Sequence, residues 1–477
     1  MCIKRSIKNV VHPYPSSTFV CKLNISSVMA LPIPSPLVFT VTTQKPELVT
    51  PAKPTPHEIK ELSDMDDQKV LRCHLPAIMF YRNSPSLGGK RDPVKVIREA
   101  LAQTLVFYYP LAGRLKEEGP DGKLIVECAG QGVWFVEADA DIRFQDFVEA
   151  EALFPPYRFL NQILYDVPGS SEILSAPLLL IQVTRLRCGG FIFAFRCNHT
   201  MADGTGVFQF LMALAEMARG ANAPFVQPVW QRELLNSRNP PRVTCTHHEY
   251  DDNVVNAESN IICAEDKVVF RNFFFGFKEL HALRMLFPPH QRMCSTFDLL
   301  TACIWKYRIA SLQLNPSEEV RLSFSSNARV YFKPPLPIGY YGNAVACPTA
   351  LSTAGELSLE HALELVRKTK SLVTEEYMRS TIDLVVIKGR PFIKYEQAYF
   401  VSDVHKMKFS DVDFGWGNAV FGGPSLVGEM KGSYFVYFKN EMGEDGIVVP
   451  ICLPPVAMER FILEVESIFK GDDSNNN

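Results

Sequence analysis

The residues best suited to chemistry lie in mid-chain, at residues 198–204, which read NHTMADG. An apolar strand-like run ends just before His199, and a helical pattern starts just after Gly204. An imidazole at such a strand end stands on rigid backbone and faces loop space, which suits a general base. Asp203 follows four residues later, and Gly204 indicates a tight turn, so this carboxylate either orients the imidazole or fixes the loop by pairing with a distant cation. For an isolated H-x-x-x-D pattern, a satisfied core histidine with a helix-capping aspartate would be the favoured interpretation.

A second unusual segment covers residues 411–419, which read DVDFGWGNA. Gly415 and Gly417 flank Trp416 and permit close packing and unusual backbone dihedrals. The segment suits the wall of a site, with the indole N–H as a donor, or a structural turn around a packed tryptophan. Asp413 begins a kinase-like D-F-G, but neither an H-R-D loop nor a glycine-rich phosphate loop accompanies it, which excludes a kinase.

The elements that must position these residues alternate between strand-like apolar runs and helical periodicity. Gly189 and Gly190 join two of the strands in a pattern typical of a hairpin, and Gly130 and Gly132 join two others. The chain therefore predicts a mixed α/β fold in two halves of similar size. We expect helices over residues 95–107, 207–218, 296–310, 359–377 and 455–469, and strands over 124–128, 133–136, 178–186, 191–197, 268–277, 320–324, 434–438 and 447–451.

The chain also divides by composition. The first acidic residue is Glu47, and the basic, serine-containing start resembles a transit peptide in composition, although an extension without a role is the favoured interpretation. A proline- and asparagine-containing stretch with little periodicity separates the two halves. We expect a non-core extension over residues 1–28, an N-terminal domain with the histidine motif over 29–222, a crossover loop over 223–266, and a C-terminal domain with DFGWG over 267–477.

Overall charge and cysteine usage exclude several classes. With 49 basic and 52 acidic side chains in 477 residues, the net charge is −3, which gives no global attraction to nucleic acid or to an anionic membrane. No run approaches the roughly 18 apolar residues of a membrane span. The 12 cysteines contain no C-x-x-C pair, so we expect reduced thiols in a reducing compartment rather than a disulfide framework or a zinc ribbon.

Taken together, the two motifs resemble the BAHD family of plant acyl-CoA-dependent acyltransferases. Further segments fit that family in the expected order, and the likeness runs from about Pro36 to Phe469. The sequences of residues 51–67 and 228–250 are similar to those of the alcohol acyltransferase branch, whose members form volatile esters from alcohols such as benzyl alcohol or methanol. The further segments are YPLAGR at 109–114, STFDLLTA at 295–302, NAR at 327–329 and GYYGNA at 339–344.

The resemblance implies two similar mixed-sheet domains, related to chloramphenicol acetyltransferase, with a channel between them. It implies acyl transfer from acyl-CoA, as co-substrate, to the hydroxyl of a small alcohol in a ternary complex. A G-x-S-x-G elbow is missing, so no covalent serine intermediate is expected. We expect no permanently bound cofactor and no metal, and a cytoplasmic monomer that binds neither nucleic acid nor membrane.

Residue roles follow from the same resemblance. His199 is expected to be the general base, and Asp203 is expected to point away from the substrate and pair with Arg329. Trp416 is a candidate for the neighbourhood of the tetrahedral oxyanion. The remaining roles are supporting ones. The segment with Asp413, Gly415 and Gly417 is expected to be structural, and the residues expected to border the coenzyme A channel are Ser295, Thr296, Asp298 and Asn343.

Other functions stay open at this point. The chain could acylate a hydroxyl or an amine of a larger specialised metabolite, or it could be a non-catalytic relative. A metal enzyme that uses His199, Asp203 and the His247-His248 pair is disfavoured, because no third ligand follows at a spacing such as H-E-x-x-H. The acyl donor and the alcohol depend on which side chains line the channel.

Overall fold

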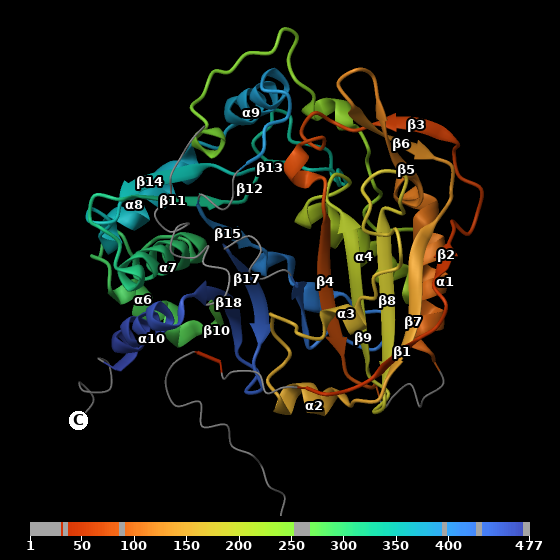
Figure 1. Ribbon diagram of the computed structural model, residues 1–477, viewed down its shortest axis with the longest axis horizontal. Coiled ribbons are helices and arrows are strands. Elements are labelled where there is room, and N and C mark those ends of the chain that lie inside the picture. Colours follow the sequence, from red (N-terminus) through yellow and green to blue (C-terminus); the bar gives the residue numbers. More distant parts are fainter. Residues whose placement is uncertain are drawn as a thin grey trace, which may run out of the picture.

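The structure is a computed structural model and describes residues 30–31, 37–84, 91–251, 268–393, 398–425 and 432–470. The expected extension over residues 1–28 lies outside the described residues, as do residues 252–266 of the expected crossover. The described parts form two α/β halves side by side, the first in red to yellow and the second in green to blue (Figure 1).

The first half is built on a mixed sheet with the strand order β1-β7-β8-β9-β4-β16, in which β2 also pairs with β7. Strands β7 and β8 run parallel, and β8 and β9 form the expected antiparallel hairpin. Both β8 and β9 are buried along almost their whole length, as expected for near-continuous apolar runs. The strands are β1 (Val41–Thr43), β2 (Glu47–Val49), β4 (His74–Tyr81), β7 (Val133–Ala140), β8 (Leu179–Leu186), β9 (Phe191–Asn198) and β16 (Phe421–Pro424).

The second half has a sheet with the order β10-β18-β17-β15-β11-β14. Strand β15 pairs in parallel with both β11 and β17, so this sheet is mixed as well. Its strands are β10 (Val269–Phe275), β11 (Glu319–Phe324), β14 (Thr349–Thr353), β15 (Tyr399–Asp403), β17 (Gly432–Lys439) and β18 (Asp445–Leu453). Two small sheets complete the strand set: β3 (Glu58–Glu61), β6 (Lys123–Cys128) and β5 (Arg114–Glu118), and β12 (Ser326–Asn327) with β13 (Val345–Ala346).

The helices begin at polar caps that the sequence supplies locally. Asp92, Ser295, Ser358 and Thr374 each accept a backbone N–H in the first turn of a helix, which satisfies a donor that has no intrahelical partner. The helices of the first half are α1 (Pro93–Phe107), α2 (Phe144–Glu149), α3 (Leu160–Ile163) and α4 (Gly204–Ala218). Those of the second are α6 (Phe277–Met285), α7 (Thr296–Leu312), α8 (Leu359–Ser371), α9 (Glu375–Ile387) and α10 (Pro455–Lys470). Among the described residues, no helix has the length and apolar character that a membrane crossing requires.

The two halves exchange segments. Strand β16, which lies far along the chain, pairs antiparallel with β4 of the first sheet. Ala30 in turn bridges Phe273 of β10 in the second sheet. The domain boundaries expected over 29–222 and 267–477 stay a prediction, but the pairing of β16 shows that the first sheet includes residues from the second half.

The strands expected over residues 124–128 and 133–136 are present as β6 and β7, which belong to a small sheet and to the first large one respectively. The structure corrects one detail of the predicted elements. The helix expected over residues 359–377 is two helices, α8 and α9, since Thr374 caps a new helix with its side chain. The mixed two-half α/β architecture itself is confirmed.

Candidate active site

His199 directly follows β9, and its backbone N–H donates to the carbonyl of Cys73 at 2.8 Å, which fixes the start of the loop. Its imidazole Nδ1 lies 3.1 Å from the carbonyl oxygen of Ala202. A carbonyl oxygen can only accept, so Nδ1 carries the proton and donates it. The lone pair of Nε2 is therefore free to accept a proton from a substrate.

His199 lines a cavity of about 430 Å³ between the two halves. The size falls in the range of ligand pockets, roughly 300 to 1,000 Å³. Much of the wall is apolar or aromatic, and it includes Leu75, Ala77 and Phe195 of the first half and Phe400, Val404, Met407, Phe409 and Tyr434 of the second. Gly204, the first residue of α4, lines the same cavity.

The surroundings of His199 keep its imidazole neutral. Burial lowers the pKa of His199 below its ordinary value, because the charged imidazolium loses solvation. The negative charges of Asp203 and Asp66 act against this shift but do not cancel it. A neutral imidazole near physiological pH is the form that a general base requires.

Asp203 fixes the loop from the side of α4. One carboxylate oxygen accepts from the Gly206 backbone N–H at 3.0 Å and from Arg329 at 2.9 Å, and the other accepts from Arg329 at 2.8 Å and from the Ala344 N–H at 3.0 Å. The bidentate ion pair with Arg329 is the contact that the resemblance implied. Burial would raise the pKa of Asp203, but the charge and hydrogen bonds of Arg329 outweigh it and hold that pKa below its usual range. The carboxylate is fully engaged away from the imidazole.

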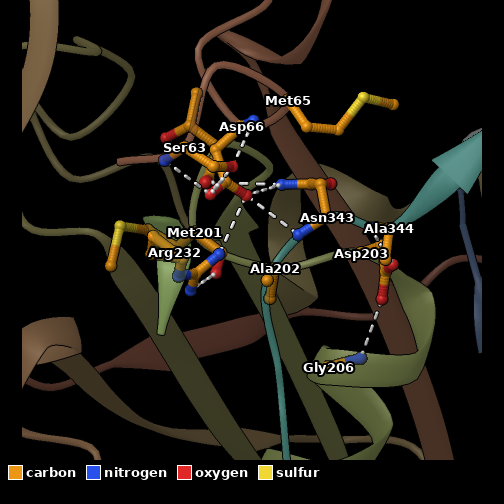
Figure 2. Close-up of polar contacts among 12 residues, drawn as sticks. Ser63, Met65, Asp66, Met201, Ala202, Asp203, Gly206, Arg232, Asn343 and Ala344 are labelled. Atoms are coloured by element: carbon orange, nitrogen blue, oxygen red, sulfur yellow. Dashed lines mark hydrogen bonds and ion pairs between the residues drawn. The ribbon is translucent and has the colours of Figure 1, made fainter. Parts of the chain in front are cut away.

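A second buried carboxylate, which sequence analysis missed, belongs to Asp66 and is drawn with its polar contacts in Figure 2. Asp66 accepts from Arg232 at 2.8 Å and from both the backbone N–H and the side-chain amide of Asn343, at 2.8 and 2.9 Å. Arg232 also donates to the carbonyl of Met201 at 2.8 Å. A Cβ on Gly342 would clash with the Arg232 guanidinium and would displace it from Asp66 and from the carbonyl of Met201. The one signal available in the sequence was an aspartate directly after the apolar Met65, which is too common to single out.

Asn343 was expected to bind coenzyme A, and the structure places it at the cavity but in contact with the histidine loop. Its side-chain amide donates to the carbonyl of His199 at 2.8 Å as well as to Asp66. The other residues expected at the coenzyme A channel lie elsewhere. Ser295, Thr296 and Asp298 form the start of α7, where Ser295 and Asp298 cap each other's backbone and Asp298 pairs with Lys370. None of these three lines the cavity, and their role in binding coenzyme A stays a prediction.

The DFGWG segment forms a tight turn against the first half. The Asp413 carboxylate accepts from the backbone N–H groups of Gly415 and Gly417 at 2.7 and 2.8 Å. Gly415 has a φ of 103° and Gly417 a φ of 88°, a region that other residues rarely adopt. Phe414 is fully buried between Tyr81 and Phe193. These contacts agree with the expected structural role of the segment.

The structure places Trp416 away from the cavity that His199 lines, which argues against the oxyanion role expected for it. Its indole packs on Phe191 with ring centroids 5.4 Å apart, and the guanidinium of Arg91 lies over it. Phe191 begins β9, whereas His199 follows its end, and seven residues of strand span about 23 Å. Trp416 is absent from the described residues that line the cavity. The resemblance in sequence did not show which end of β9 the DFGWG segment contacts.

Replacing Trp416 by phenylalanine is therefore expected to change stability and not chemistry. The loss of ring contact with Phe191 and Arg91 should lower the free energy of unfolding by about 1–2 kcal/mol. The kcat should stay within about twofold of the wild-type value. Urea unfolding and steady-state kinetics measure the two quantities. A loss of kcat without a loss of stability would place Trp416 at the reaction after all.

The adjacent histidines of the metal alternative have other partners. His247 Nε2 lies 2.8 Å from the Ser380 hydroxyl, and its Nδ1 lies 3.1 Å from Glu249. His248 pairs with Asp251 near the surface. Among the described residues, no group of three or more His, Cys, Asp or Glu side chains has the arrangement of a metal site.

A family model described as the Transferase family matches residues 39–468. Benzyl alcohol O-benzoyltransferase of Petunia hybrida is 57% identical over 450 residues, which cover 93% of this chain and 96% of the relative. The enzyme of the same name from Nicotiana tabacum is 58% identical over 445 residues, covering 92% and 95%.

Solved structures with the same fold are more distant in sequence. Vinorine synthase has a TM-score of 0.69 at 23% identity and covers 90% of this chain and 98% of its own. TRI101 of F. graminearum, complexed with coenzyme A and deoxynivalenol, has a TM-score of 0.69 at 18% identity and covers 84% and 96%. These likenesses establish the fold.

Proposed function

We propose that this chain forms esters from acyl-CoA and small alcohols, with His199 as the general base. The premise is that the chain belongs to the Transferase family, which comprises the BAHD acyltransferases that its motifs resemble. The chain is an acyltransferase of the alcohol O-acyltransferase type, like its relatives at 57% and 58% identity. The observation that carries the proposed base is a neutral imidazole, oriented through Nδ1, whose Nε2 is free at a cavity lined by both halves.

The proposed reaction is direct transfer within a ternary complex. The Nε2 atom of His199 accepts the proton of the alcohol hydroxyl while the oxygen attacks the thioester carbonyl carbon. The tetrahedral intermediate then expels the thiolate of coenzyme A. This thiolate accepts from Nε2 the proton that came from the alcohol. A thiolate is a good leaving group, so a separate strong general acid is not required. Positioned base catalysis accelerates such a step by roughly 10² to 10⁴.

The cavity wall supports apolar substrates. Phe195, Phe400, Phe409 and Tyr434 offer aromatic surface for an aromatic acyl group or an aromatic alcohol. We therefore propose benzoyl-CoA and benzyl alcohol as the first pair to test, with acetyl-CoA, anthraniloyl-CoA and aliphatic alcohols as alternatives. The cytoplasmic location and the monomeric state stay predictions.

A matrix of acyl-CoA donors against alcohols tests this function. Ester is measured by mass spectrometry and free coenzyme A by a thiol reagent. We expect one ester formed for each thiol released, and the release should depend on the alcohol. Thiol release that is independent of every alcohol would indicate a hydrolase, and the absence of both products with all pairs would contradict the proposal.

The pH dependence follows from the environment of His199. Burial lowers the pKa of His199 below 6.5, and only the neutral imidazole accepts a proton. The value of kcat/KM should therefore be constant at neutral pH and fall as the pH drops through this lowered pKa, with a midpoint below 6.5. Initial rates from about pH 5 to pH 8 measure it, and melting curves over the same range identify any unfolding. A midpoint above 6.5 would contradict the environment assigned to His199.

A further inference from the structure

The histidine loop is held by a second set of contacts, in addition to the Asp203–Arg329 pair. Asp66 is fully buried and belongs to the segment between β3 and β4. Its second carboxylate oxygen accepts from the backbone N–H and the hydroxyl of Ser63, at 3.1 and 2.5 Å. With the bonds from Arg232 and Asn343, every side of this carboxylate is occupied, so its position is strictly determined.

The two partners of Asp66 bind consecutive carbonyl groups of the loop. The Asn343 amide donates to the carbonyl of His199 at 2.8 Å and lies 3.4 Å from that of Thr200. Arg232 donates to the carbonyl of Met201. Figure 2 shows Asp66 between Arg232 and Asn343, with the loop residues Met201 to Asp203 beside them. The backbone that carries the imidazole is thus tied to one buried carboxylate.

We propose that Asp66 and Asn343 are positioning residues for His199, and that Asp66 also supplies a negative charge that stabilises the protonated imidazole. This inference rests on the proposed function, in which His199 becomes protonated during the reaction. A loop displaced by about 1 Å would misalign Nε2 with the alcohol, which typically costs up to about 100-fold in rate. Asn343 would then act on kcat and not on the binding of coenzyme A.

The charges near His199 come from several elements. Asp203 and Asp66 are each paired with an arginine, Arg329 and Arg232 respectively. Other charged or titratable groups at the cavity are Glu249, Tyr250, Asp403, Tyr434, Cys73 and Cys347. Both Asp203 and Asp66 raise the proton affinity of His199 against the effect of burial. Removal of the Asp66 charge should therefore lower the pKa of His199 further.

Three variants separate these effects. Asp66→Asn should lower kcat about tenfold and move the acidic limb of kcat/KM, the fall of kcat/KM at low pH, to lower pH. Asn343→Ala leaves the Asp66–Arg232 pair intact and should lower kcat about tenfold. The KM values of acyl-CoA and alcohol should stay within about twofold of the wild type, and the acidic limb of kcat/KM should stay at the same pH. Asp67→Asn is the matched control, since Asp67 is also buried but pairs with Arg72 and Arg390; its limb and kcat should match the wild type.

Two outcomes would overturn the proposal. If Asn343→Ala raises the KM of acyl-CoA and leaves kcat unchanged, Asn343 binds coenzyme A instead. If folded Asp66→Asn has the same acidic limb as Asp67→Asn, the charge of Asp66 does not act on His199. Should Asp66→Asn fail to fold, because Arg232 is left without its partner, the Asn343→Ala result decides.

A direct titration separates this inference from the proposed function. Imidazole resonances of protein labelled with ¹⁵N-histidine report the pKa of His199, and its signal is assigned by its loss in His199→Gln. The Asp66→Asn variant should show a lower pKa for His199 whether or not the enzyme turns over. An unshifted titration would refute the role of the Asp66 charge, whereas full turnover by His199→Gln would refute the base.

Discussion

His199→Ala is expected to lower kcat by about 10² to 10⁴ and to leave the fold intact. The alanine removes the Nε2 lone pair at the cavity, and the described residues that line this cavity include no second histidine to replace it. His199 as a residue keeps some exposed surface, and the side-chain hydrogen bond described for it is to the Ala202 carbonyl, so the fold loses little. Ester formation and thiol release measure kcat, and a melting curve measures the fold.

His248→Ala is the matched control. His248 is a partly exposed histidine that pairs with Asp251 and does not line the described cavity, so its variant should keep full activity. If His199→Ala turned over as fast as His248→Ala, His199 would not be the base. If His199→Ala failed to fold, His199→Gln, which preserves most of the side-chain volume, would replace it in the same comparison.

Asp203→Asn should reduce activity and stability together. The change removes the partner of Arg329, whose side chain is 12% exposed, and leaves a largely buried cation without its ion pair. Such a loss costs about 3 kcal/mol or more in the free energy of unfolding. The loop from His199 to Asp203 also loses a rigid end, so kcat should fall by roughly 10- to 100-fold. Urea unfolding measures the first effect, and steady-state kinetics measure the second.

An exposed ion pair provides the comparison for Asp203. Asp445 pairs with Lys439 at the surface, where water screens the charges, so Asp445→Asn should leave both the urea unfolding curve and kcat close to those of the wild type. An Asp203→Asn protein with the wild-type unfolding curve but no activity would indicate that Asp203 takes part in proton transfer. That result would contradict the loop-fixing role.

Local patterns predicted the elements that carry the candidate base. The buried apolar run that becomes β9, the turn at Gly189-Gly190 and the periodicity of α4 are each encoded within about 15 neighbouring residues. The cap is local too, because Asp203 accepts from the Gly206 N–H three residues on. These are short-range interactions, which a single sequence displays directly.

Predictions that needed a register or a sheet edge were less successful. Trp416 belongs to a recognisable motif, yet nothing in the motif says which end of β9 it will cover, and the structure places it beside Phe191. Ser295 and Asp298 form a capping box, which is a sufficient reason for their pattern at the start of α7. A motif that serves a local purpose carries no information about the cavity.

The sequence by itself determined the family, the candidate base and the alternation of strands and helices. Tertiary structure alone decided what surrounds the base. Asp66 and Asn343 are 277 residues apart, and the Asn343 amide donates both to Asp66 and to the carbonyl of His199 only because the two halves pack against each other. The physical reason is that propensity, capping and periodicity act between near neighbours, whereas contacts between buried polar groups depend on how whole sheets are placed. The same packing of the two halves creates the cavity at which Nε2 is free.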